Sequence, residues 1–272
     1  MAGRPRRRSI PIDVSKPSVA RMYDYFLGGT DNYVVDREAC AELLRIAPST
    51  KELALNNRAF LIRAVRYLAA ECGIRQFMDY GSGLPTQPNV HQIAHETDKN
   101  ARVVYIDNDP IVLGHGRMML QEDPETTAVL AQDMRNTDAI FRSAQVQRLI
   151  RNEPTAALFV SVLHCIPDED DPWQLVRDVA QRLPSGSYLV LCQLASDDET
   201  TRNDTTRFMR DITGGRWGRV RSAEEISRYF DGLELQKAKE LCEVSRWYPD
   251  TEVFPRQATE EWIEYGGVAR IP

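Results

Sequence analysis

From residue 74 onward, short apolar segments alternate with amphipathic stretches of helical length. The apolar segments cover residues 76–80, 102–106, 127–131, 156–163 and 187–192. Strands that are almost continuously apolar must be covered on both faces, and strands that alternate with helices form right-handed βαβ units around a parallel sheet. The chain is therefore predicted to be an α/β protein with a doubly wound, mostly parallel sheet.

The segments on either side of this core have different patterns. Residues 16–73 have three amphipathic stretches: one ends at Gly28, one extends from Asp36 as a candidate cap, and one extends from Ser49 to Gly73. Residues 201–272 are less regular, with a helix capped by Ser222 and two further strands expected at 233–247 and 261–268, the final strand antiparallel. We expect one domain over 16–272, with a helical cap (16–73), a cofactor-binding core (74–200) and a sheet edge (201–272).

Composition limits the partners and the compartment. The formal net charge of −6 argues against a general nucleic-acid binder. The one basic run is Arg4, Arg6, Arg7 and Arg8. We expect residues 1–15 to be a disordered basic tail, although such a tail could touch nucleic acid or an acidic membrane. An apolar run of about 18 residues is lacking, so no membrane span is expected.

Five scattered cysteines show neither a disulfide framework nor a thiolate metal site. This pattern suits a reducing cytoplasm. His91 and His95 have a chelating spacing, but Gln92 stands where a metalloprotease motif needs glutamate, so no metal is expected.

Polar residues follow the first three predicted strands, at the edge where ligands bind in open α/β sheets. They are Asp79, Gly81 and Gly83 after the first strand, Asp107 and Asn108 after the second, and Asp133 and Met134 after the third. Asp107 follows Gly83 by about 24 residues, a spacing that suits a ribose-binding carboxylate. Asp133 could accept a hydrogen bond from the adenine amino group while Met134 packs on the adenine ring. Together these positions predict an adenosine site.

The glycine loop distinguishes between two adenosine ligands. A dinucleotide pyrophosphate needs a third small residue and a helix N-terminus close behind the loop. Here Gly83 is followed by Leu84 and Pro85, and the helix is expected to begin only near Asn89. This arrangement disfavours a nicotinamide dinucleotide and favours S-adenosylmethionine.

The chain also resembles a family of actinobacterial S-adenosylmethionine-dependent methyltransferases formerly classed as a domain of unknown function. The matching runs are residues 18–32, 57–61, 76–86, 89–91, 103–110, 162–164, 186–190 and 265–270. The resemblance implies a Rossmann-like class I methyltransferase fold and an S-adenosylmethionine site, and leaves the acceptor open. Departures at 192–195 and 236–239 lie toward the expected acceptor side.

Further candidates complete the predicted site. His164, just after the fourth strand, is a candidate general base or a structural histidine. The acids at 168–171 could orient it or form a solvated acidic turn before the next helix. Tyr23 could close over the methionine moiety or simply pack, and Arg58 or Arg21 could pair with the cofactor carboxylate. Ser161, in the predicted fourth strand, is a further candidate for cofactor binding.

We expect methyl transfer to a small molecule. The alternatives are a non-catalytic S-adenosylmethionine sensor or partner protein and, less favoured, a nucleotide-dependent oxidoreductase. The sequence leaves the oligomeric state open.

Overall fold

A computed structural model of the chain describes residues 13–119, 123–249 and 261–272. Within these residues eight strands form one sheet in the order β3-β2-β1-β4-β5-β8-β6, with β7 also pairing to β8. The strands are β1 (Gln76–Tyr80), β2 (Arg102–Asp107), β3 (Thr127–Ala131), β4 (Ala156–Val160), β5 (Tyr188–Ala195), β6 (Glu234–Leu235), β7 (Cys242–Glu243) and β8 (Ile263–Arg270). The first five are parallel, and β8 is antiparallel to β5. This confirms the predicted doubly wound sheet with an antiparallel final strand.

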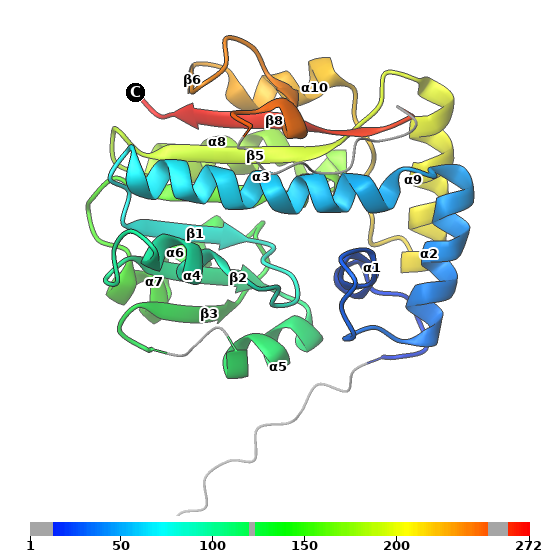
Figure 1. Cartoon of the computed structure of the whole chain (residues 1–272), viewed down its shortest axis with the longest axis horizontal. Coiled ribbons are helices and arrows are strands. Elements are labelled where there is room, and N and C mark those ends of the chain that lie inside the picture. Colours follow the sequence, from blue (N-terminus) through cyan, green and yellow to red (C-terminus); the bar gives the residue numbers. More distant parts are fainter. Residues whose placement is uncertain (1–12, 120–122, 250–260) are drawn as a thin grey trace, which may run out of the picture.

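Helices cover both faces of the sheet, as Figure 1 shows. The α-helices of the described residues are α1 (Val19–Phe26), α2 (Val34–Ile46), α3 (Thr50–Ala70), α4 (Val90–His95), α5 (Pro110–Met119), α6 (Thr137–Arg142), α7 (Ala144–Leu149), α8 (Pro172–Arg182), α9 (Glu199–Thr213) and α10 (Ala223–Ser227). One core lies between the sheet and α3 with α4, and a second lies between the sheet and α7, α8 and α10. The near-continuous apolar strands are explained by these two cores.

A third apolar cluster joins the N-terminal helices to the carboxyl end of the sheet. Met22 and Phe26 of α1, Leu53 of α3 and Met209 of α9 belong to it. In Figure 1, α1 lies beside the carboxyl ends of the parallel strands, and α2 packs along α9. The predicted helical cap therefore covers the edge of the sheet where a ligand is expected.

Several local predictions were wrong. Asp36 is not the N-cap of α2 but its N3 residue, which closes a capping box with the N-cap Tyr33. β4 ends at Val160, before the predicted 163, because Ser161 takes a positive φ of 56°. The strand expected over 233–247 is two short strands and the 3-10 turn Val244–Arg246, since Lys237 at φ 61° interrupts it. The long helix α9 was not predicted.

The basic run at Arg4 to Arg8 lies outside the described residues. Among the helices that the structure describes, none combines the length and apolar character needed to cross a membrane.

A buried ion pair holds α1 against α2. The Arg21 Nε lies 2.6 Å from Asp36 Oδ2, and the two side chains are 2% and 0% exposed. Asp36 also accepts hydrogen bonds from the backbone N–H groups of Ser18 at 2.9 Å and Tyr33 at 2.8 Å. Arg21 is thus committed to Asp36, and the alternative in which it pairs with the cofactor carboxylate loses its support.

We expect Asp36→Asn to lower the free energy of unfolding by about 3 kcal/mol, because it leaves the Arg21 charge buried without a counter-ion. Urea denaturation measures the change. The control is Glu42→Gln, which removes an exposed ion pair with Arg45 and should leave stability almost unchanged. Equal effects of the two substitutions would contradict the assigned role of Asp36.

Candidate functional site

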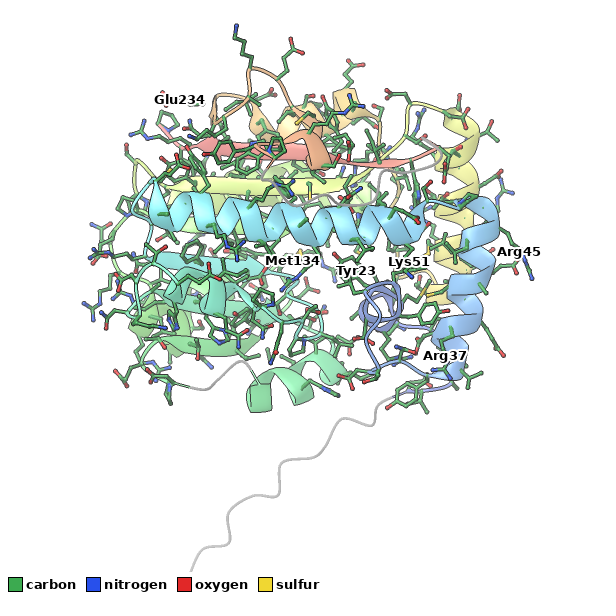
Figure 2. The ribbon with its side chains drawn as sticks, in the orientation of Figure 1. Tyr23, Arg37, Arg45, Lys51, Met134 and Glu234 are labelled. Carbon is green, nitrogen blue, oxygen red and sulfur yellow. The ribbon has the colours of Figure 1, made fainter. Side chains whose placement is uncertain are left out.

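A cavity of about 810 Å³ opens at the carboxyl ends of β1 to β5 and under α1. Each residue of the predicted site lines it: Tyr23, Arg58, Asp79, Gly81, Gly83, Asp107, Asn108, Asp133, Met134, Ser161 and His164. Figure 2 shows Tyr23 and Met134 on either side of the space between α1 and the sheet. Residues far apart in the sequence are therefore brought to one site by the strand ends.

The loop after β1 is shaped by its glycines and by Asp107. Gly81 has a φ of 71°, and a Cβ atom there would lie 2.3 Å from Val162 Cγ2 and 3.1 Å from Met134 Cε. Only glycine fits this approach without displacing its neighbours. The Gly83 N–H donates to Asp107 Oδ2 at 3.0 Å. The ribose-binding candidate thus also fixes the glycine loop.

The acids at the strand ends differ in their proton affinity. Burial raises the pKa of Asp79 to about 7, against the opposing effect of Arg58, and burial also raises the pKa of Asp107. Hydrogen bonds from Arg135 instead hold the pKa of Asp133 below its usual range. Asn108 Nδ2 donates to Asp133 Oδ2 at 3.3 Å. Asp133 is therefore a fixed carboxylate, whereas Asp79 changes charge near neutral pH.

Arg58 lies at the other side of the cavity, on α3. Its Nη2 donates to the carbonyls of Thr86 and Pro88, which fixes the loop after the glycines. Its Nε is buried and has no hydrogen-bond partner among the described residues, and the same holds for the Ser82 hydroxyl. Buried donors without partners are rare in proteins and indicate groups that a ligand satisfies. Both fit a polar ligand such as S-adenosylmethionine.

Tyr23 takes part in a buried chain of polar side chains. Its hydroxyl accepts a hydrogen bond from Asn57 Nδ2 at 2.7 Å and donates to the Ala54 carbonyl at 3.2 Å. Asn57 Oδ1 in turn accepts from the Cys192 thiol at 3.0 Å. The aromatic ring that we expected over the methionine moiety is thus fixed in the cavity wall.

His164 is in the cavity wall, but not in the state expected of a general base. It is 3% exposed, and its pKa is lowered to about 3 by burial first and by Arg221 second. Its Nδ1 accepts from the Leu194 N–H at 3.4 Å, so the proton of the neutral ring is on Nε2. A ring in this state is a hydrogen-bond donor toward the cavity.

The acids that were expected to orient His164 have other partners. Asp168 pairs with Arg219 and Arg221, Asp170 pairs with Arg135, and Asp171 caps α8. These partners give no support to an orienting role for Asp168, Asp170 or Asp171 and agree with the acidic turn that the sequence also allowed.

Some cavity residues were not predicted from the sequence. The side beneath α1 and α9 is apolar and aromatic, lined by Met22, Leu194, Met209, Trp217 and Trp262. Glu264, on β8, contacts Ser161 from behind. The one signal in the sequence for Glu264 is a carboxylate between Ile263 and Tyr265, inside the expected final strand. Among the described residues, no group of three His, Cys, Asp or Glu side chains is arranged to hold a metal ion.

The model of the S-adenosyl methyltransferase family matches residues 5–272. The chain belongs to this family. A DUF574 family protein from Streptomyces avermitilis is 36% identical, with a TM-score of 0.87 over 96% of this chain and 100% of that one. A candidate methyltransferase from Thermobifida fusca is 38% identical, with a TM-score of 0.83 over 95% and 96% of the two chains. No curated protein matches.

The family inferred from the sequence motifs is thereby confirmed, and S-adenosylmethionine is its cofactor. The unpartnered donors of Arg58 and Ser82 and the tight glycine loop are features of this chain that suit such a ligand.

Burial of Asp79 leads to a stability prediction for the ligand-free protein. The pKa of Asp79 in the folded protein is raised above its pKa in the unfolded chain. The stabilising contribution of this side chain is therefore complete below about pH 4 and is lost as the pH rises to about 7. Asp79→Asn cannot ionise, so its stability relative to wild type should increase over this range. Urea midpoints at pH 4 to 8 measure it.

Asp133→Asn is the matched control, because the pKa of Asp133 is lowered and the sign reverses. That variant should lose stability relative to wild type at neutral pH and approach it as the pH falls. A constant difference between wild type and Asp79→Asn would contradict the raised pKa.

Proposed function

We propose that this protein transfers the methyl group of S-adenosylmethionine to a small molecule bound at the apolar side of the cavity. The observation that carries this proposal is that a row of strand-end acids and an aromatic chamber share one cavity. The volume of about 810 Å³ lies in the upper part of the range for small-molecule sites, which is usually about 300–1,000 Å³. This supports simultaneous binding of a cofactor and an acceptor.

The strand ends would hold the adenosine part of the cofactor. Asp107 would accept hydrogen bonds from the ribose hydroxyls, because its carboxylate is already fixed by backbone N–H groups. Asp133 would accept a hydrogen bond from the adenine amino group, and Met134 would pack on the adenine ring. Asn108 would keep Asp133 in place through its side-chain amide.

Asp79 and Arg58 would bind the two charged ends of the methionine part. An ammonium group beside Asp79 would favour its ionised form, and a carboxylate would satisfy the unpartnered Nε of Arg58. The two side chains already influence each other's pKa, since Arg58 lowers that of Asp79. They are therefore close enough to bind one zwitterion.

When bound, the cofactor supplies a methyl group activated by the sulfonium charge. The chain then has to orient the acceptor and exclude water. The side chains from α1 and α9 would exclude water at the apolar side. His164, as a neutral donor, would hydrogen-bond the acceptor through Nε2. This replaces the general-base role that the sequence suggested.

Isothermal calorimetry tests the cofactor site. S-adenosylmethionine and S-adenosylhomocysteine should bind, whereas NAD should not, because the loop after β1 lacks the features that a pyrophosphate requires. Asp107→Ala should weaken binding of S-adenosylhomocysteine by about 1–3 kcal/mol, since it leaves ribose hydroxyls unpaired.

The control is Asp98→Ala, an acid in the turn after α4 that pairs with Arg75 outside the cavity. It should bind S-adenosylhomocysteine like the wild type. If Asp107→Ala also bound with unchanged affinity, the ribose role would be refuted.

A further inference from the structure

A buried carboxyl group lies directly behind the cavity. Glu264 belongs to β8, pairs in register with Leu194 of β5 and is 1% exposed. Its Oε1 accepts a short hydrogen bond from the Ser161 hydroxyl. Ser161 itself lines the cavity, whereas Glu264 does not. The serine therefore connects an internal acid to the place where ligands bind.

Ser161 is held in a conformation that connects these two places. It directly follows β4 and has a φ of 56°, which costs a residue other than glycine about 1 kcal/mol or more. Its N–H donates to the Cys192 carbonyl at 2.9 Å, so the sheet fixes the strained turn. Strain of this kind persists where the surrounding structure enforces it and is common at functional sites.

The titratable groups around Glu264 differ from it in charge state at neutral pH. Three titratable side chains interact electrostatically with Glu264: Tyr23 of α1, Cys165 of the turn after β4 and Cys192 of β5. Burial raises the pKa of each of the three. All three are therefore neutral at pH 7. Burial raises the pKa of Glu264 to about 7, against the hydrogen bond from the Ser161 hydroxyl. Glu264 is the member of this group that titrates near neutrality.

We propose that Ser161 and Glu264 form a proton-accepting pair beside the transferred methyl group, and that the pair selects an acceptor with a hydroxyl group. This inference rests on the proposed methyltransferase function. Ser161 contacts the acceptor, and Glu264 is a positioning residue that acts through it. A neutral amine attacks without losing a proton first, whereas a hydroxyl oxygen is a weak nucleophile until a base takes its proton.

The step balances in atoms and charge. The acceptor hydroxyl gives its proton to Ser161 Oγ as Ser161 gives its own proton to the Glu264 carboxylate. The acceptor oxygen forms a bond to the methyl carbon, the carbon–sulfur bond breaks, and its electron pair stays on sulfur. Glu264 then returns the proton to solvent.

The location of Glu264 is tested by comparing two ligands that differ in sulfonium charge. S-adenosylmethionine carries the charge and S-adenosylhomocysteine does not, while Asp79 and Arg58 face the same groups in both. As the pH rises through about 7, ionised Glu264 should strengthen binding of S-adenosylmethionine relative to S-adenosylhomocysteine by about fivefold. Calorimetry between pH 5.5 and 8.5 measures this ratio.

In Glu264→Gln the ratio should be independent of pH, while affinity for S-adenosylhomocysteine stays at the wild-type value and shows that the fold is intact. A ratio that is independent of pH in the wild type, or that rises equally in the variant, would overturn the proposal. Failure of both ligands to bind wild type would instead contradict the proposed function.

Ser161→Gly provides a second variant, because glycine accepts the positive φ while removing the hydroxyl. In the wild type, the hydrogen bond from the Ser161 hydroxyl lowers the pKa of Glu264. Its loss in Ser161→Gly should therefore move the inflection of the affinity ratio of the two ligands to higher pH. An inflection that stays in place would show that Ser161 is not coupled to Glu264.

The acceptor class is tested with 2-naphthol and 2-naphthylamine, probes of one size that fit an aromatic-lined cavity and differ in the nucleophilic atom. Formation of S-adenosylhomocysteine, followed by mass spectrometry, should be faster with 2-naphthol and should rise with pH through about 7. Glu264→Gln should lower kcat at least about tenfold with little change in KM. Preferential use of the amine, or equal rates in the variant and wild type, would overturn the proposal.

Discussion

The reversal of strand order between β1 and β4 is the constraint on which the rest of the structure depends. The two strands are parallel neighbours, with Asp79 opposite Leu158, but the chain leaves β1 toward β2 and leaves β4 toward β5. Their following loops diverge, and a crevice opens between them. Asp79 and Ser161 therefore reach the same cavity although about 80 residues separate them. The two apolar cores on the sheet faces keep both strands in register.

The parts of the fold that local pattern determines could be predicted from the sequence. The apolar strands β1 to β5 alternate with helices, and polar residues follow them at a fixed edge, so the polar side of the cavity could be anticipated. The apolar side could not, because Met209 and Trp217 reach it from α9 and the loop after it, and the placement of α9 depends on its packing against α2. Glu264 was missed because its importance comes from its partner on β4, far away in the sequence.

The site combines acids whose burial opposes their ionisation. Burial raises the pKa of Asp79 in the cavity wall and of Glu264 behind it to about 7 and also raises that of Asp107, so these three acids, unlike Asp133, are shifted toward their neutral forms. Such groups reduce stability at neutral pH and become useful only when a cation or a proton donor arrives. A cofactor with an ammonium and a sulfonium group supplies two positive charges at once. Binding and ionisation would then reinforce each other.

His164 and Glu264 show why residue type alone does not assign a base. Arg221 is fully buried and donates to the Leu163 and Ile166 carbonyls at 3.0 and 2.9 Å, which holds the turn that carries His164. Burial first, and the charge of Arg221 second, lower the pKa of the imidazole, so the packing that fixes His164 in the wall also removes its proton affinity. Burial instead raises the pKa of Glu264 to about 7, against the hydrogen bond from the neutral Ser161 hydroxyl. The position at the strand end can be read from the sequence, whereas proton affinity is set by neighbours that only the fold brings together.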